Sequence, residues 1–390
     1  MISFENTEIA FSGKSDKDLN WSYRLFKMMG KPWLVKVGAL MANIALKLRL
    51  PVKGMIKKTI FKQFCGGESI ADCENKIELL SKFKIGTILD YSVEGKESEE
   101  DLDKTRDEII ATIHRAKGNP LIPFSVFKPT GISRTELLEK WNKANAVLSD
   151  LEKQEIEKVL ARVDAICKAG FDADVPILID AEDSWFQDGI DRMANNMMAK
   201  YNKQKAIIYN TAQMYRHDRL EFIKNTYLES VEGNYFVGIK LVRGAYMEKE
   251  RARAKELGYP SPIQPNKEAT DRDYNLALEF MTDHLDKFSI CAGTHNETSS
   301  SYLVEILEKK KIAKNDHRIY FAQLLGMSDH ISFTLAHQGY NVAKYVPYGP
   351  VREVMPYLMR RAQENTSVAG QMGRELSLIV KEKKRRKNKD

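Results

Sequence analysis

Eight short apolar runs, separated by amphipathic helical stretches, constrain the fold of this chain more than any other feature. They begin near residue 85 and are rich in β-branched and aromatic residues. Near-continuous apolar runs that alternate with helices are typical of parallel strands buried on both faces. The runs are residues 86–92, 122–128, 175–182, 205–212, 235–242, 288–294, 318–325 and 342–348. Eight such units predict an α/β fold of the (βα)8 barrel type rather than an open sheet.

The remainder of the chain lacks this alternation. Residues 1–84 show only helical patterns, so we expect a helical N-terminal extension before a barrel over residues 85–368. Residues 369–390 form a basic C-terminal tail that ends in "KEKKRRKNKD", and a terminal charge run of this kind is usually disordered and solvating. The 390 residues, 43% of them hydrophobic, are enough for one barrel with an extension.

Several function classes are disfavoured by motifs that the sequence lacks. There is no G-x-G-x-x-G, no full P-loop and no H-E-x-x-H, and no Cys/His cluster has zinc spacing, so we expect no metal site. The four cysteines form no C-x-x-C and are too scattered for a disulfide framework, which favours a reducing compartment. No signal peptide and no window of 18 uncharged apolar residues is present. We therefore expect a cytoplasmic protein, with a peripheral position on the inner face of the cell membrane as a variant.

The segment 31–64 combines basic and apolar residues and contains no acidic residue. Such a mixture is typical of a segment that contacts an anionic membrane surface. A helical extension packed on the main domain, with its bases in water, explains the pattern equally well. The formal net charge of +7 also allows a basic RNA- or membrane-binding module without catalysis, but we find no aromatic platform for nucleic acid and expect no nucleic-acid partner.

Polar side chains end every one of the eight runs. Barrel enzymes work at the carboxyl ends of their strands, so these groups are expected to converge on one mouth. They are Tyr91 and Glu94, Lys128, Asp180 and Glu182, Asn210 and Gln213, Lys240 and Arg243, Thr294 to Asn296, Gln323, and Tyr348. A single polar strand end is usually a helix cap or a surface residue, but eight in succession indicate a site.

The helix expected after the last strand carries two adjacent arginines. Tyr357, Arg360, Arg361 and Glu364 are spaced i, i+3, i+4 and i+7, which places them on one helical face. Guanidinium groups are suited to binding a carboxylate. An arbitrary Arg-Arg pair more often belongs to a solvated helix face, so the rest of the chain has to decide between these readings.

Three segments together resemble the proline dehydrogenase family: "KLVRGAYMEKER" (240–251), "THNETSS" (294–300) and "YVPYGPVREVMPYLMRRAQEN" (345–365). The resemblance runs through all eight strands, and Tyr-x-x-Arg-Arg-x-x-Glu-Asn is its most specific motif. It implies a distorted (βα)8 TIM-type barrel with FAD at the carboxyl mouth and the last helix over that mouth. It also implies oxidation of L-proline to Δ1-pyrroline-5-carboxylate, the first step of proline catabolism, with hydride transfer from proline C5 to flavin N5.

The resemblance assigns the substrate site residue by residue. Arg360 and Arg361 would clamp the proline carboxylate, and Glu94 would pair with Arg360. The remaining residues of the substrate site are Lys128, Asp180, Tyr348, Tyr357 and Glu364. Lys128 would add a third cation held by Asp180, the two tyrosines would pack the pyrrolidine ring, and Glu364 would orient the arginines.

The resemblance also assigns the FAD site. Its residues are Gln213, Lys240, Val242, Arg243, Gly244, Tyr246, Lys267, Thr270, Thr294, His295, Asn296 and Gln323. The first six resemble isoalloxazine and phosphate contacts, and Thr294 to Asn296 resemble ribose and adenine-side contacts. Lys240 is a departure, because many bacterial members have arginine at this position.

The partners implied by the resemblance are L-proline and a membrane quinone that accepts the electrons. Residues 31–64 would then attach the protein transiently to the bilayer surface. The chain is too short for a second, NAD-dependent dehydrogenase, so we expect a monofunctional enzyme whose product passes to a separate pyrroline-5-carboxylate dehydrogenase. Hydroxyproline or another cyclic imino acid remains an alternative substrate. A reaction like that of methylenetetrahydrofolate reductase is a further alternative that the double arginine disfavours.

Overall fold

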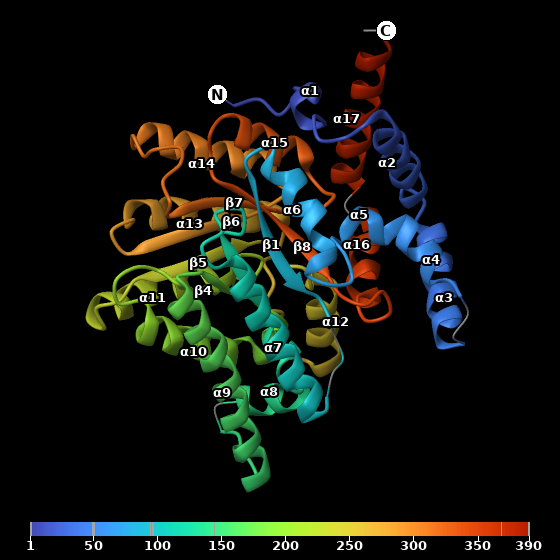
Figure 1. Cartoon of the computed structure of the whole chain (residues 1–390). Helices are drawn as coiled ribbons and strands as arrows, with labels where there is room; N and C mark the ends of the chain where they lie inside the picture. Colours follow the sequence, from blue (N-terminus) through green and yellow to red (C-terminus); the bar gives the residue numbers. More distant parts are fainter. Residues whose placement is uncertain are drawn as a thin grey trace. The chain divides into compact units, whose positions relative to one another are not determined.

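The structure, a computed structural model of the whole chain, describes residues 2–48, 51–93, 95, 97–143, 145–367 and 369–388. Its eight strands form one closed parallel barrel in chain order (Figure 1). They are β1 (Ile85–Tyr91), β2 (Phe124–Phe127), β3 (Ile177–Ile179), β4 (Ile208–Gln213), β5 (Val237–Val242), β6 (Phe288–Gly293), β7 (Ile319–Leu324) and β8 (Val342–Tyr348). The eight predicted runs are therefore confirmed as strands, and the (βα)8 fold class with them.

Helices precede the barrel and alternate with its strands, as expected. Before β1 lie α1 (Thr7–Ala10), α2 (Asp16–Met29), α3 (Pro32–Lys47), α4 (Lys53–Ile56), α5 (Lys62–Phe64) and α6 (Glu74–Ser81). Between the strands lie α7 (Glu99–Ala116), α8 (Thr135–Asn142), α9 (Asp150–Ala173), α10 (Ser184–Tyr201), α11 (Arg219–Glu232), α12 (Met247–Leu257), α13 (Lys267–Asp283), α14 (Glu297–Lys309) and α15 (Asp329–His337). After β8 follow α16 (Met355–Ser367) and α17 (Ala369–Lys387).

The helices begin where the sequence supplies caps. Ser98 accepts a hydrogen bond from the backbone N–H of Asp101 at the start of α7. Ser149 and Glu152 form a reciprocal capping box at the start of α9. Each cap pairs backbone N–H groups that have no partner within the helix, and such a cap contributes about 1 kcal/mol.

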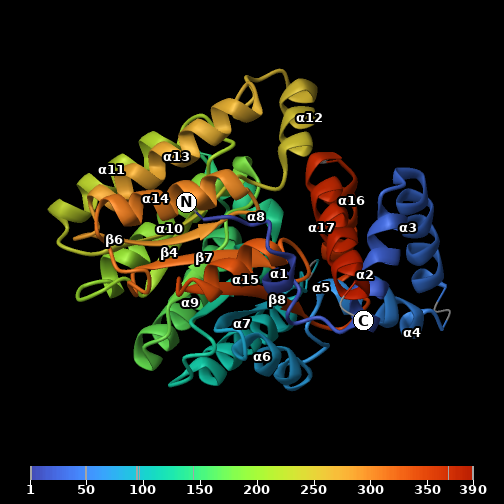
Figure 2. The same cartoon turned by 90° about the horizontal axis from the view of Figure 1, so that it is seen from above.

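The chain divides into two compact units. The first contains residues 95–322, and the second contains residues 2–94 and 323–390. In the first unit, α10, α11 and α13 pack on the outer face of strands β4 to β6 (Figure 2). Most residues of these strands are buried on both faces, which explains why they read as continuous apolar runs.

The second unit joins the two ends of the chain. Strand β1 pairs with β8 in parallel from Ile85↔Val342 to Tyr91↔Tyr348. One apolar core is shared by α1, α2, α5, α16 and α17, and it includes Phe11, Phe26 and Ile379. Helix α16 packs against α2, α3 and α17.

The C-terminal tail differs from the expectation. Residues 369–387 form helix α17 rather than a disordered run. Leu378 and Ile379 are buried, and Glu382 is fully buried between Arg385 and Arg386. The segment was predicted to be a solvating tail because of its basic residues, and two of these, Arg385 and Arg386, pair with the buried carboxylate.

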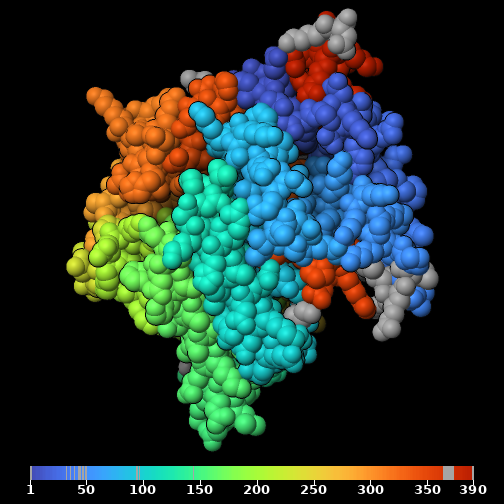
Figure 3. All heavy atoms as spheres, viewed as in Figure 1, coloured from blue at the N-terminus to red at the C-terminus, as the bar shows by residue number. Residues whose placement is uncertain are grey.

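Helix α3 has one exposed apolar face. Its members are Trp33, Val37, Leu40 and Met41, which are 63%, 46%, 61% and 65% exposed. Their spacing of i, i+4, i+7 and i+8 forms a single stripe. In Figure 3 the blue surface of the N-terminal helices lies open to solvent at the edge of the view. Among the described residues, no helix is long and apolar enough to cross a membrane.

Candidate active site

A buried aspartate between two lysines lies at the strand ends of the first unit. Asp180 follows β3, Lys128 follows β2, and Lys240 lies in β5. Asp180 Oδ2 lies 3.1 Å from Lys128 Nζ, and Asp180 Oδ1 accepts a hydrogen bond from Lys240 Nζ. Asp180 is 8% exposed and Lys240 is 5% exposed. The expected pairing of Lys128 with Asp180 is thus present, and Lys240 joins it.

The two lysines determine the protonation state of Asp180. Burial alone would raise the pKa of the Asp180 carboxyl, but the charges of Lys240 and Lys128 hold that pKa below its usual range. Asp180 is therefore ionised at neutral pH and lies between the two lysines.

Arg243 gathers several of the residues predicted for the cofactor. It follows β5 and pairs with Asp271 of α13 at 2.8 Å. Its Nη1 donates to Thr294 Oγ1 at 2.6 Å, and Asp271 also binds Lys267. Arg243, Lys267 and Thr294 thus lie in one charged group. Nearby, Asn296 caps α14 by accepting a hydrogen bond from the backbone N–H of Ser299 at 2.9 Å.

Gly244 occupies a position that excludes other residues. Its φ is +120°, and a Cβ atom there would lie 2.6 Å from the Tyr215 ring. A side chain would therefore clash with the ring as well as strain the backbone. This close approach keeps the turn between β5 and α12 compact, directly before Tyr246, which precedes the first residue of α12.

Gln213 carries a buried oxygen with no hydrogen-bond donor among the described residues. It ends β4 and is 3% exposed, and its Oε1 has no partner in that part of the chain. A buried acceptor without a donor is costly, by about 1–3 kcal/mol. A flavin ring offers N–H donors, so this atom fits the bound group that the resemblance implies.

The other predicted cofactor residues show no feature that points to a ligand. Val242 ends β5, Thr270 is buried in α13, and His295 lies between Thr294 and Asn296. Gln323 belongs to the second unit, where its Oε1 accepts a hydrogen bond from Ser332 of α15 at 2.8 Å. That oxygen therefore already has a hydrogen-bond donor within the protein.

The double arginine lies on a helix, as predicted. Tyr357, Arg360 and Arg361 all belong to α16 in the second unit. Arg361 is 8% exposed, and its guanidinium lies 5.3 Å from the centre of the Tyr357 ring. Glu94 and the side chain of Glu364 lie outside the described residues, so their predicted roles stay predictions.

Strand β8 presents its tyrosines on opposite faces. Tyr348 is fully buried, and its ring lies 5.4 Å from that of Tyr91. Side chains alternate along a strand, so Tyr348 shares a face with Lys344, whose Nζ binds Asp329 of α15 at 2.8 Å. Tyr345 lies on the other face, away from α15. No role was predicted for Tyr345 from the sequence. Because Tyr345 directly follows Lys344 in the strand, the sequence already implies that their side chains point to opposite faces.

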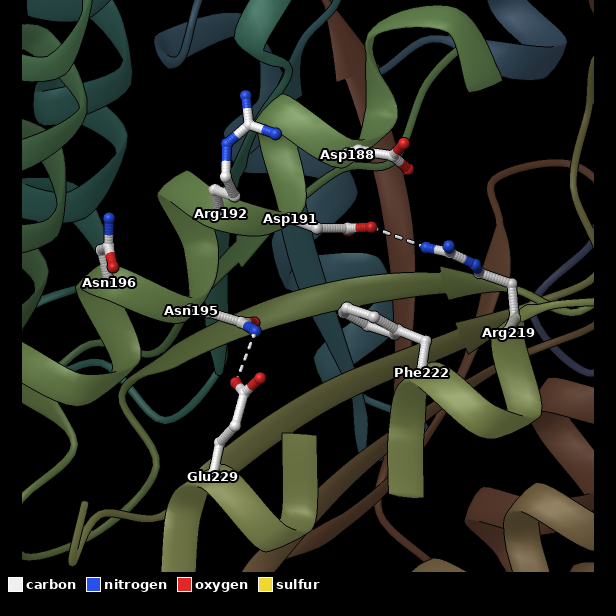
Figure 4. A pocket seen from close by; sticks show the side chains of 8 residues that line it. All are labelled: Asp188, Asp191, Arg192, Asn195, Asn196, Arg219, Phe222 and Glu229. Atoms are coloured by element: carbon white, nitrogen blue, oxygen red, sulfur yellow. Dashed lines mark hydrogen bonds and ion pairs between the residues drawn. The ribbon is translucent and has the colours of Figure 1, made fainter. Parts of the chain in front are cut away.

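A surface pocket of about 440 Å³ lies elsewhere in the first unit (Figure 4). Its lining includes Asp191 and Arg219, which form a buried ion pair at 2.6 Å. None of the residues that line it was predicted from the sequence for a site. No cluster of three or more His, Cys, Asp or Glu side chains suited to a metal occurs in the described part of the chain.

Comparison with known proteins decides the family. A family model for proline dehydrogenase matches residues 73–374. The chain belongs to the proline dehydrogenase family. Its relatives include "Proline dehydrogenase 1, mitochondrial" of Dictyostelium discoideum, 33% identical over 98% of this chain and 74% of the relative. They also include the human protein of the same name, 42% identical over 60% of this chain and 40% of the relative.

One further match is to a protein of another name, and another is to a solved structure. The carbapenem antibiotics biosynthesis protein CarD of Pectobacterium carotovorum is 30% identical over 86% of both chains. The crystal structure of proline utilization A from Bdellovibrio bacteriovorus superposes with a TM-score of 0.71 at 20% identity. That match covers 92% of this chain but only 38% of the larger one. The matched proteins therefore range from ones of similar length to much longer ones.

Proposed function

We propose that this chain oxidises L-proline to Δ1-pyrroline-5-carboxylate and uses FAD. The observation that carries the proposal is a family match over residues 73–374 that includes the buried Arg361 on α16. Bound FAD would supply the acceptor for the hydride that leaves proline C5. The amine proton is lost in the same oxidation, so that the C5–N bond becomes an imine.

The substrate carboxylate is assigned to Arg360 and Arg361, with Lys128 as a third cation. Planar guanidinium groups bind a carboxylate through paired hydrogen bonds, each contributing about 1.5–3 kcal/mol. Tyr357 is proposed to hold one ring face, and Glu94 and Glu364 to orient the arginines. The resemblance assigns the other ring face to Tyr348, although Tyr348 shares its face of β8 with Lys344. The same cations would lower the pKa of the substrate ammonium, which favours the neutral amine that the oxidation requires.

The cofactor is assigned to the first unit. Gln213, Lys240, Val242, Arg243, Gly244 and Tyr246 would hold the isoalloxazine and phosphate portions, and Thr294 to Asn296 the ribose and adenine side. Lys267, Thr270 and Gln323 are the outer members of the set. The buried oxygen of Gln213 without a donor and the side-chain-free turn at Gly244 support this assignment.

A membrane quinone is proposed as the electron acceptor, with α3 as the contact to the membrane. The exposed stripe of Trp33, Val37, Leu40 and Met41 supports contact with the interface of an anionic bilayer. The segment 31–64 contributes eight bases and no acid, so its charge is complementary to anionic lipid. The protein would then be peripheral on the cytoplasmic face of the membrane.

The proposed functional division assigns catalysis to residues 85–368, which include α16. Residues 1–84 and 369–390 would support this part of the chain. Its product would pass to a pyrroline-5-carboxylate dehydrogenase activity outside residues 1–390.

A visible spectrum before and after anaerobic addition of L-proline tests the function. The expected result is flavin absorption bands that bleach with L-proline. Flavin bands that respond only to hydroxyproline would replace the substrate and keep the class of reaction. A protein that stays colourless after incubation with FAD would contradict the proposal.

A further inference from the structure

The loop after β3 carries a second buried carboxylate, Glu182, which has no role in the function proposed so far. Unlike Asp180, which binds two lysines, Glu182 contacts the neighbouring loop through its side chain. Its Oε1 accepts a hydrogen bond from the backbone N–H of Thr130 at 2.9 Å, and its Oε2 lies 2.5 Å from Thr130 Oγ1. Thr130 is in the short turn Pro129–Gly131, directly after Lys128. Glu182 thus holds the turn that positions this lysine.

The backbone of Glu182 is fixed from the opposite side. Its N–H donates to Gln187 Oε1 at 2.7 Å, and Gln187 Nε2 donates to Asp191 Oδ1 at 2.9 Å. Asp191 in turn binds Arg219, the pair drawn with a dashed line in Figure 4. These three side chains of α10 and α11 are each 5% exposed or less. Buried, mutually bonded side chains of this kind are rigid, so Glu182 holds Thr130 from a fixed position.

We propose that Glu182 is a positioning residue, which fixes Lys128 for the substrate carboxylate by holding Thr130 and tunes the charge that this carboxylate meets. The inference rests on the proposed oxidation of proline. It adds to that function a residue that acts through Lys128 rather than on the substrate.

The charge of Glu182 changes near neutral pH. Burial raises the pKa of its carboxyl to about 7, and the charge of Asp183 also raises it, while the hydrogen bonds of Thr130 and the charge of Lys128 act in the opposite direction. The charged groups around it are Lys128, Asp183 with its partner Lys249 at 2.7 Å, and Asp180 with its lysines. When Glu182 is protonated, one negative charge is removed from the surroundings of Lys128. When it is ionised, a second anion offsets the attraction for a substrate carboxylate.

Protonation changes this charge without removing the contact to Thr130. A neutral carboxyl donates one O–H, which Thr130 Oγ1 can accept, while Oε1 continues to accept from the Thr130 N–H. Glutamine at position 182 offers the same pattern, with an amide N–H as the donor. Glu182→Gln therefore mimics the protonated residue, whereas Thr130→Val removes the hydroxyl that Glu182 holds.

The kinetic test compares KM and kcat for L-proline across pH 6–8.5. For Glu182→Gln we expect a KM equal to that of the wild type at pH 6 and about threefold lower at pH 8, with kcat changed less than about twofold. Thr130→Val should raise KM at every pH, and Thr130→Ser, which keeps the hydroxyl, should restore it. A ratio of KM values that does not change with pH would overturn the electrostatic part of the proposal.

Glu250 provides a matched control. It is fully buried and binds Ser184 as Glu182 binds Thr130. Its Oε1 accepts a hydrogen bond from the backbone N–H of Ser184 at 2.7 Å, and its Oε2 lies 2.5 Å from Ser184 Oγ. Lys128 is not among the groups that shift its pKa. Glu250→Gln should therefore leave the pH dependence of KM unchanged. If it reproduced the effect of Glu182→Gln, the role of Glu182 would be structural only and the proposal would fail.

Amide hydrogen exchange separates this inference from the proposed function, because it needs no substrate. In Glu182→Ala the Thr130 N–H loses its acceptor, so the peptide around residues 128–134 should exchange faster than in the wild type. Unchanged exchange would overturn the positioning role even if proline is oxidised. If Glu182→Ala exchanges faster but the wild type does not oxidise proline, the contact between Glu182 and Thr130 is supported and only the proposed function is contradicted.

Discussion

At the scale of single residues, burial separates Arg361, the proposed carboxylate ligand, from a surface arginine. Arg361 is 8% exposed and lies over Tyr357, whereas Arg352, nine residues earlier, is exposed. Only an arginine offers a planar fork that matches both oxygens of a carboxylate. The difference in exposure makes these two residues a natural pair for comparison.

We expect Arg361→Lys to raise KM for L-proline by about tenfold or more, because the loss of one charge-assisted hydrogen bond costs roughly 1.5–3 kcal/mol. Initial rates at several proline concentrations measure the effect. Arg352→Lys is the control and should behave as the wild type. Equal KM values for both variants would argue against Arg361 as a carboxylate ligand.

Glu182 leads to a prediction for stability. The pKa of its carboxyl rises from 4.5 to about 7 on folding, mainly through burial. The folded state therefore binds this proton more tightly than the unfolded chain, so the contribution of Glu182 to stability is complete below pH 4.5 and is lost as pH rises through about 7. The loss amounts to about 3 kcal/mol.

Glu182→Gln has no proton to lose at this position. Its melting temperature should exceed that of the wild type at pH 8, and the gap should close toward pH 5. Thermal unfolding at both pH values provides the measurement. A constant gap would mean that Glu182 does not titrate in this range.

At the scale of elements, α3 has an apolar face that no described element covers. We expect Leu40→Glu with Met41→Glu to reduce co-sedimentation with anionic liposomes at low salt, because both changes place charge in the stripe. Leu228→Glu is a suitable control, since Leu228 is 58% exposed on α11 and lies outside the stripe. Wild-type protein that stays in the supernatant would rule out the contact with lipid.

The elements were predictable from the sequence to different degrees. The strands stood out because parallel strands buried on both faces are continuously apolar, although β3 is shorter than its predicted run of 175–182. Helix α17 was missed because Lys and Arg side chains conceal the burial of Leu378, Ile379 and Glu382. The resemblance assigned Asp180 of "DAED" to Lys128, but the sequence did not distinguish Glu182, which holds Thr130, from an ordinary surface carboxylate. That distinction depends on contacts between segments far apart in the chain.

At the scale of the whole molecule, the two chain ends are required for one core. Leu378 and Ile379 of α17 are at most 1% exposed and pack with Phe11 and Phe26. A chain that stops after residue 367 would leave this apolar surface open to water, with a loss of about 2–5 kcal/mol for each large side chain removed. We expect the truncated protein to unfold at a clearly lower temperature and to aggregate, as scanning calorimetry and light scattering would measure. Unchanged unfolding would mean that α17 does not contribute to the core.

The pairing of β1 with β8 has a consequence for the synthesis of this protein. Residue 85 leaves the ribosome long before residue 342, its partner in the sheet. Until then β1 has an open edge, and the helices before it lack the surface on which they pack. Contacts between such distant segments form slowly, and exposed edges and apolar faces promote association with other chains. The newly made N-terminal segment therefore has to be protected, by chaperones or by rapid local helix formation, until the end of the chain arrives to complete its unit.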